Sequence, residues 1–473
     1  MPASRMRPSV FLRWFVVALS VTVVAAACTP GGDDDGGGDG DSVQLTILVN
    51  AVRGGKNAAT AEWIDEYVIP NFEDQMSEED RDVTVELEET GVEDEDYKAR
   101  IALDLSAGEG ADIMGFDQFW VAEFAAAGYL EPMSQAVGDK VDDWEGWDQI
   151  PESVQGSLEL EGEPYGIPFG TDGRVLFFNK KLFEQAGLPQ DWQPESWDDI
   201  IETARTLKEE LPDVTPLQLN AGISMGEATT LQGFVPILNG TGRAMYDEES
   251  GQWLGDTPEL RSALEFFDTI YSEELGDAQL QQRADGRDRS FQQFSQERIA
   301  ILAESDYFWR DVVSPDGELF PMRNRDEVVG YAKIPAQEPG AGLNGQDFVS
   351  ASGGTGHILN SNTENPEETW ELLSFMGSEE AILDFVERES RITAREDVNE
   401  QVLGEDPMLQ YISEEVLPIT WYRPGFEEYP QISIAVTEAL EGLVAGNFDV
   451  EQAASEYTSQ LQDIAGEEQV LTE

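Results

Sequence analysis

The chain has 473 residues and a formal net charge of −68 at pH 7, because 96 Asp and Glu outnumber 28 Lys and Arg. Forty per cent of the residues are hydrophobic, so the charge does not indicate disorder, and the length predicts two or three domains. One Cys and one His exclude an intrachain disulfide and any Cys-rich or multi-His metal centre. The negative charge repels phosphate backbones and argues against nucleic-acid binding.

The N-terminus predicts export. Three arginines, Arg5, Arg7 and Arg13, precede the apolar run at residues 14–27. A helix of this length spans about 21 Å, less than the roughly 30 Å of a bilayer's hydrocarbon core. We therefore predict a signal peptide at residues 1–27, with a membrane anchor helix as the alternative.

Residues 28–42, rich in Gly and Asp, predict a solvated tether. A calcium loop is disfavoured there, because the Glu expected at the twelfth position is missing. The excess of carboxylates and the scarcity of Lys suit a salty external medium, in which ions screen the self-repulsion.

Strands and helices alternate from residue 43 on. Apolar runs predict strands at 43–49, 83–87, 111–115, 175–178, 299–303 and 329–334. Apolar residues at helical spacing predict helices at 63–68, 97–105, 119–127, 197–211, 369–376, 380–387, 432–444 and 450–464. Ser196 with Asp199 predicts a partial capping box at the start of the fourth helix. The pattern is typical of an α/β fold with two lobes.

A hydrolase is one hypothesis. Gly222-Ile-Ser224-Met-Gly226 fits the G-x-S-x-G nucleophile elbow, with His357 as the only histidine that could serve as base. Such a match arises by chance in about one chain in five of this composition, so it is weak. Residues 353–356, Gly-Gly-Thr-Gly, lack the context of a phosphate loop and predict a flexible crossing between lobes.

Polar and aromatic residues beside predicted loops indicate a sugar site. Asp117 and Gln118 directly follow a strand, at the edge where open α/β sheets bind ligands. Sugars offer flat C–H faces to aromatic rings and hydroxyls to polar side chains. The aromatic residues next to loops are Trp120, Tyr307, Trp309, Trp421 and Tyr422.

Several stretches together resemble the extracellular solute-binding proteins of carbohydrate ABC transporters, the maltose-binding-like family. They are YGIPFGTDG at 165–173, LFFNKKLFEQAGLP at 176–189, WDDI at 197–200, FSQERIAILA at 294–303, GGTGHILN at 353–360, NPEETWELLSFM at 365–376 and FDVEQAA at 448–454. The resemblance runs in collinear order over about residues 43–465. Ala25-Ala26-Ala27-Cys28 resembles a lipobox, which implies a lipid on Cys28.

The resemblance implies a periplasmic-binding-protein-like fold, two α/β lobes with a ligand cleft at the hinge. We expect lobe one at 43–169 plus 357–410 and lobe two at 170–356 plus 411–473. It implies that the ligand is bound by Asp117, Gln118, Asp172, Asp306, Tyr307 and Arg53. We add Trp120, Trp421 and Arg423 for their aromatic or planar groups next to loops.

The expected function is capture of a sugar or oligosaccharide and its delivery to a membrane permease, without a cofactor, a metal or catalysis. We expect a monomer, anchored by lipid on the extracellular face of the cell membrane. The alternatives are a binding protein for another solute, such as a polyamine, and a secreted serine hydrolase that uses Ser224.

Overall fold

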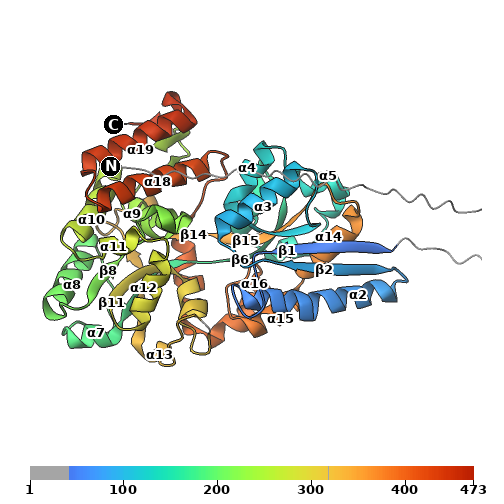
Figure 1. Ribbon diagram of the computed structural model, residues 1–473, viewed down its shortest axis with the longest axis horizontal. Coiled ribbons are helices and arrows are strands. Elements are labelled where there is room, and N and C mark those ends of the chain that lie inside the picture. The colour runs from blue at the N-terminus through green and yellow to red at the C-terminus, as the bar shows by residue number, and fades with distance from the viewer. Residues whose placement is uncertain (1–41, 318, 473) are drawn as a thin grey trace, which may run out of the picture. The chain divides into compact units, whose positions relative to one another are not determined.

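The computed structural model describes residues 42–317 and 319–472, which lie in one compact unit (Figure 1). The predicted signal peptide, the tether up to Asp41 and the lipid on Cys28 lie outside the described residues.

The first lobe is built on a five-stranded sheet in the order β2-β1-β3-β15-β6. Its strands are β2 (Val83–Glu89), β1 (Val43–Val49), β3 (Ile113–Asp117), β15 (Gly354–Leu359) and β6 (Gly166–Thr171). The first three strands are parallel, whereas β15 runs antiparallel to both of its neighbours, β3 and β6. The sheet is therefore mixed, and it fits the α/β fold that the alternation of strands and helices predicted.

Helices cover both faces of this sheet, because alternate residues of each strand point to opposite faces. Leu45 and Ile47 pack on the side of α1 (Ala58–Trp63), α2 (Ile69–Glu78), α14 (Pro366–Met376) and α15 (Glu379–Arg388). Leu48 packs on the side of α3 (Asp94–Ser106) and α4 (Val121–Ala126). On that side, the Tyr97 hydroxyl donates to backbone oxygens of both β1 and β3 and ties α3 to the sheet.

The second lobe is built on a four-stranded sheet in the order β12-β7-β11-β8. Its strands are β12 (Val329–Ala332), β7 (Arg174–Asn179), β11 (Ile299–Ser305) and β8 (Thr215–Gln218). One face packs in the same cluster as α8 (Trp197–Glu210), α10 (Pro258–Ser272), α18 (Tyr429–Val444) and α19 (Val450–Ala465). The other face packs against α12 (Gly286–Ser295) and the π-helical turn η8 (Phe308–Val312). Beside this sheet, β13 (Ile334–Pro335), β14 (Phe348–Ser352) and β16 (Thr420–Tyr422) form a three-stranded sheet.

The remaining elements are short. The helices are α5 (Met133–Val137), α6 (Glu152–Gln155), α7 (Lys180–Gln185), α9 (Val235–Asn239), α11 (Ala278–Gln281), α13 (Arg325–Val328), α16 (Glu396–Val402) and α17 (Pro407–Tyr411), and the strands are β4 (Glu159–Leu160), β5 (Glu163–Pro164), β9 (Tyr246–Asp247), β10 (Gln252–Leu254) and β17 (Val470–Leu471).

Two short joins carry the chain between the lobes. Strand β6 ends at Thr171 and β7 begins at Arg174; β14 ends at Ser352 and β15 begins at Gly354. A third passage lies between α15 and β16, where the Thr171 amide donates to the Ile392 oxygen at 3.3 Å. Because these joins are short, side chains at their ends are brought close together.

The strand pairing shifts the borders predicted for the lobes. Residues 170–171 and 354–356 pair within the first sheet, where lobe two was expected. Within 403–410, expected in lobe one, Leu403, Met408 and Leu409 bury their side chains in the cluster that contains Phe177 of β7. The lobe boundaries otherwise stay a prediction, because lobes are defined by how they move.

The predicted elements are present, with local differences. Ser196 and Asp199 form a complete capping box, since each side chain accepts from the other's backbone N–H. The helix expected at 119–127 is split into a 3-10 turn at Gln118–Trp120 and α4, and Gly128 follows at a φ of 71°. Residues 329–334 form two strands rather than one.

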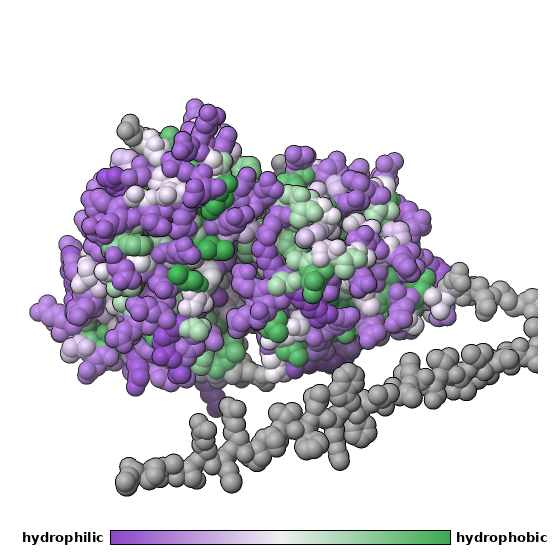
Figure 2. Space-filling view, turned by 45° about the horizontal axis from the view of Figure 1, so that its top comes forward, coloured by the Kyte–Doolittle hydropathy of each residue, from purple (hydrophilic) through white to green (hydrophobic). Residues whose placement is uncertain are grey.

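The surface is mostly hydrophilic on the face shown in Figure 2. Among the described residues, the exposed large hydrophobic side chains are Val92, Leu103, Ile223, Leu319 and Ile434. No helix within residues 42–317 and 319–472 combines the length and apolarity needed to cross a bilayer.

Candidate functional site

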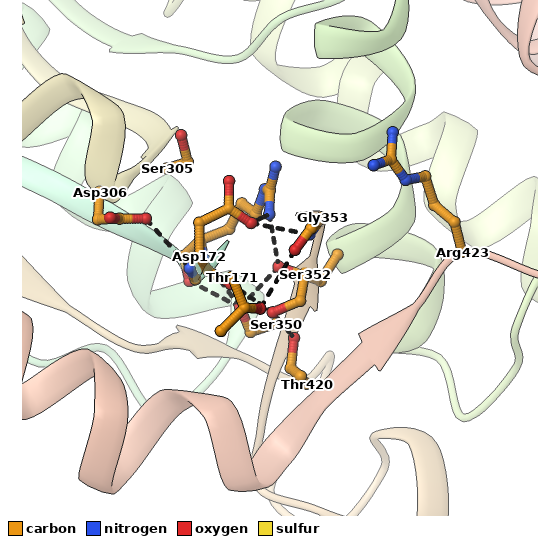
Figure 3. Close-up of polar contacts among 12 residues, drawn as sticks. Thr171, Asp172, Ser305, Asp306, Ser350, Ser352, Gly353, Thr420 and Arg423 are labelled. Atoms are coloured by element: carbon orange, nitrogen blue, oxygen red, sulfur yellow. Dashed lines mark hydrogen bonds and ion pairs between the residues drawn. The ribbon is translucent and has the colours of Figure 1, made fainter. Parts of the chain in front are cut away.

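A hydrogen-bond network holds the two joins together (Figure 3). Asp172, between β6 and β7, accepts from the Gly353 amide at 2.8 Å and from the Arg174 guanidinium. Thr171 donates to the Gly353 oxygen at 3.2 Å, and the Ser352 hydroxyl donates to the Asp172 backbone oxygen. The network therefore fixes the place where the chain passes from one lobe to the other.

Asp172 is ionised in this setting. Burial alone would raise the pKa of its carboxyl, but the Arg174 guanidinium and the Gly353 N–H outweigh burial and hold that pKa below its ordinary value. Sequence reasoning selected Asp172 but missed Arg174, which begins a strand that is otherwise apolar. An arginine at the start of a buried strand is a signal that could have identified it.

A second group joins the end of β3 to the segment after β16. Asp117 accepts from the Arg423 Nη2 at 2.7 Å, and Glu227 accepts from the Arg423 Nη1 at 3.3 Å. The Arg423 side chain is 3% exposed, and its guanidinium lies 4.4 Å from the centre of the Phe119 ring. A Cβ on Gly353 would lie 3.1 Å from the Arg423 Nη2, so this group borders the joins.

The pKa of Asp117 is raised to about 6, because the effect of burial exceeds that of the Arg423 charge. Glu227 was not among the predicted site residues. It precedes a stretch of small and apolar residues, and its position gives no sequence signal that separates it from the many surface acids.

The third group follows β11. The Asp306 Oδ1 accepts from the Gly173 amide at 3.2 Å, and its Oδ2 lies 3.4 Å from the Arg310 Nε. Burial raises the pKa of Asp306 to about 6, although Arg310 opposes it. Arg310 also pairs with Glu389, at the end of α15, and so forms a second ion pair between the lobes.

Tyr307 lies half-buried beside two cations. The guanidinium carbons of Arg310 and Arg287 lie 5.6 and 6.0 Å from the ring centre. Burial raises the pKa of its hydroxyl to about 12. Arg287 in turn donates from Nε and Nη2 to Glu304, at 2.9 and 2.8 Å, and Glu304 is fully buried. Sequence reasoning missed this pair, although Glu304 interrupts the apolar run of β11.

The other predicted site residues lie apart or are packed. Arg53 is exposed and pairs with Asp65 and Glu89 of its own lobe, each at 2.6 Å. Trp120 is 3% exposed and packs edge-on against Phe116. Their roles as ligand contacts stay predictions.

Gln118 and Trp421 lie closer to the joins. The Gln118 oxygen is buried without a hydrogen-bond partner among the described residues, and a Cβ on Gly354 would lie 2.9 Å from it. Trp421, in β16, is half-buried and pairs in register with Ala351 of β14. The structure thus brings together Asp117, Gln118, Asp172, Asp306, Tyr307, Trp421 and Arg423 around the joins.

The proposed Ser–His pair is not assembled. Ser224 is exposed in the 3-10 turn Ile223–Met225 of the second lobe. His357 lies in β15 of the first lobe, 5% exposed, with its ring 5.2 Å from that of Phe169. Burial and the nearby Arg391 lower the pKa of His357 to about 4. The described part of the chain also holds no cluster of three or more His, Cys, Asp or Glu suited to a metal ion.

Arginines offset most of the negative charge between the lobes. Seven carboxylates lie there, each within 4.0 Å of an arginine: Asp117, Asp172, Glu227, Glu304, Asp306, Asp311 and Glu389. Their partners are Arg174, Arg287, Arg310 and Arg423, and Arg391 lies 4.0 Å from Glu389. These five arginines offset all but two of the seven negative charges, in a chain of net charge −68.

Known proteins match the chain in sequence and in fold. The family model described as bacterial extracellular solute-binding protein matches residues 56–382. A Brucella abortus protein named as a binding protein is 22% identical over 354 residues, 73% of this chain and 78% of its own length. The mannitol-binding protein of Pseudomonas aeruginosa is 28% identical over 183 residues, 37% of this chain and 38% of its own.

Among solved structures, an ABC transporter solute-binding protein of Thermotoga lettingae bound with α-D-tagatose matches with a TM-score of 0.73 at 25% identity. The match covers 90% of this chain and all of that one.

Proposed function

The chain belongs to the bacterial extracellular solute-binding protein family, and we propose that it captures a sugar, an oligosaccharide or a related polyol for an ABC importer. The ligand site that we propose lies between the lobes, around Asp117, Asp172, Tyr307, Trp421 and Arg423. Support for a carbohydrate comes from the relatives, which include a mannitol-binding protein and a structure bound with tagatose. The likeness to the Thermotoga protein supports a fold with two lobes.

The observation that carries the choice of ligand class is the pairing of charges. A polyamine needs carboxylates that are free to neutralise it, whereas every carboxylate named above between the lobes already faces an arginine. Carboxylates and guanidinium groups in contact with one another still offer strong hydrogen-bond donors and acceptors to hydroxyl groups. An uncharged polyhydroxy ligand fits such a site.

Capture proceeds through differential affinity. In the open form each lobe offers its own contacts, and in the closed form both lobes contact the solute, so the solute stabilises closure. The closed protein then docks on a membrane permease. We further propose that Cys28 carries a lipid that holds the protein at the outer face of the membrane. Replacing Cys28 by Ser would then move the protein from the membrane fraction to the medium.

The test is a ligand panel measured by thermal melting. Residues 42–473, in molar salt, are heated with monosaccharides, oligosaccharides, polyols and polyamines. A ligand at 100 times its Kd stabilises the folded form by about 2.7 kcal/mol. A saturable rise in Tm with one group of sugars or polyols supports the proposal, and a rise with polyamines alone overturns the ligand class.

Variants locate the site. Tyr307→Ala and Trp421→Ala are expected to abolish the ligand-induced rise in Tm. The control is Tyr67→Ala, because Tyr67 is also half-buried but stacks on Phe375, on the outer side of the first sheet. A ligand-induced rise that survives in both site variants places the ligand elsewhere.

A further inference from the structure

The Asp117–Arg423 ion pair crosses from one lobe to the other. Asp117 ends β3 of the first sheet, and Arg423 follows β16, which pairs with β14 beside the second sheet. Asp117 and Arg423 are therefore carried by different lobes, and their 2.7 Å contact exists only while the lobes are in this arrangement.

Arg423 is held from the side of the second lobe. Its Nη1 donates to Glu227, which also accepts from the Tyr429 hydroxyl and the Ser433 hydroxyl of α18, each at 2.6 Å. Hydrogen bonds from Tyr429 and Ser433 hold the Glu227 carboxylate against α18. Glu227 in turn holds the Arg423 guanidinium so that it points toward the first lobe. Arg423 therefore keeps its place when Asp117 withdraws.

Aromatic rings lie beside the pair in this arrangement of the lobes. Phe119, two residues after Asp117, contacts the Arg423 guanidinium and packs edge-on against Tyr429 at 6.0 Å. The Arg423 side chain is 3% exposed and that of Asp117 is 30% exposed, so the cost of removing the two charges from water offsets much of their mutual attraction. Removing one partner is costly, because the other charge then stays largely out of water without compensation.

We propose that the Asp117–Arg423 ion pair governs lobe closure in the absence of ligand, and that Glu227 is the positioning residue that aims Arg423. The inference rests on the proposed function only in that opening and closing serve solute capture. The lobes close favourably only in the relative position in which Asp117 meets Arg423. In any other closed position one of the two charges is left without its partner.

Other charged side chains lie around the ion pair. Asp117 faces Arg423, Glu227 and Asp94 at the start of α3; Arg423 also faces Asp172 at the join. If Arg423 is removed, Asp117 loses its ion-pair partner while Glu227 and Asp94 still face it. The closed form then opposes ionisation of Asp117, and protonation of this carboxyl restores closure.

The experiment measures closure directly, by energy transfer between dyes on the two lobes. Residues 42–473 lack the only cysteine, Cys28, so two cysteines can be introduced at the exposed Ser106 of α3 and Ser455 of α19. No sugar is added, so failure of the ligand panel does not affect the outcome.

Arg423→Gln is expected to lower the ratio of closed to open molecules about tenfold or more at pH 8, since it strands Asp117. Asp117→Asn has a smaller effect, because Arg423 keeps Glu227 as its counter-charge. The double variant Asp117→Asn with Arg423→Gln recovers most of the closure. Lowering the pH to 5 protonates Asp117 and restores closure in Arg423→Gln. The same change of pH leaves the closure of the double variant unchanged, because that variant has no carboxyl at position 117.

Arg205→Gln is the control, because Arg205 pairs with Glu273 inside the second lobe and exposes half of its side chain. Its energy transfer should match that of the wild type. Equal closure in the wild type and Arg423→Gln overturns the proposal, and so does a double variant that is more open than either single one. Urea unfolding of each variant separates loss of closure from loss of fold.

Discussion

Removal of Arg287 tests how much a buried ion pair contributes in this protein. Glu304 is fully buried and accepts two charge-assisted hydrogen bonds from Arg287, one from Asn220 at 2.9 Å and one from the Ser305 amide at 3.2 Å. In Arg287→Met the apolar part of the side chain is kept, and Glu304 loses its only cationic partner among the described residues.

The expected cost follows from burial. Breaking a buried ion pair by removing one partner costs about 3–5 kcal/mol, because the remaining charge has no compensation. With a urea m value of about 3 kcal/mol/M or somewhat more for a large chain, the unfolding midpoint should fall by roughly 1 M. The assay is urea unfolding of residues 42–473, followed by tryptophan fluorescence.

Two variants serve as controls for Arg287→Met. Arg205→Met removes an arginine with the same two-pronged geometry, Nε and Nη2 to Glu273 at 2.8 and 2.6 Å, but on the surface. Its midpoint should stay close to that of the wild type, since exposed ion pairs contribute little. Arg287→Met with Glu304→Gln removes both charges and should recover much of the loss. Similar midpoints for the two Arg→Met variants would refute the reasoning.

Three further predictions concern stability. The pKa of Asp117, raised to about 6, means that the native state disfavours the ionised carboxylate, so stability present below pH 4 is lost as the pH rises to about 6. Relative to Asp117→Asn, the wild-type free energy of unfolding in urea should fall over this pH range by at most about 3 kcal/mol. Gly222→Ala should prevent recovery of folded protein, because its Cβ would lie 1.8 Å from the Gln281 oxygen, and expression with circular dichroism checks it. Ser196→Ala should cost about 1 kcal/mol in urea unfolding, through loss of the α8 cap.

The elements could be predicted because the period of the apolar residues differs between strands and helices. Ser196 and Asp199 show how far such local rules reach, since the capping box needs only residues three positions apart. Breaks within a predicted helix or strand are less predictable. The end of the helix predicted at 119–127 lies within one residue of the observed end at Ala126. The 3-10 start at Gln118–Trp120 was not predicted, and there Phe119 packs against Tyr429, about three hundred residues further on.

The site could be predicted only in part. Asp117 was found because it follows a predicted strand, at the edge where open α/β sheets bind ligands, and Asp172 was found through the family resemblance. Glu227 gave no signal, since in a chain with 96 acids one more carboxylate carries no information. Trp120 was chosen by residue type alone, and this aromatic residue beside a loop is packed at 3% exposure. Its indole N–H has no partner among the described residues, so its role as a ligand contact stays a prediction.

The cations between the lobes suggest a second physical reason for the excess of Arg over Lys. The chain has 21 Arg and 7 Lys, a ratio that suits a salty medium. Yet the five cations named between the lobes are all arginines, and a planar guanidinium presents a fixed fork of N–H donors to carboxylates while its face stacks on a ring. Arg423 bridges Asp117 and Glu227 over Phe119, and Arg287 binds Glu304 over Phe291. Arg423→Lys should therefore keep the charge but lose the bridge, and its closure should fall between those of the wild type and Arg423→Gln.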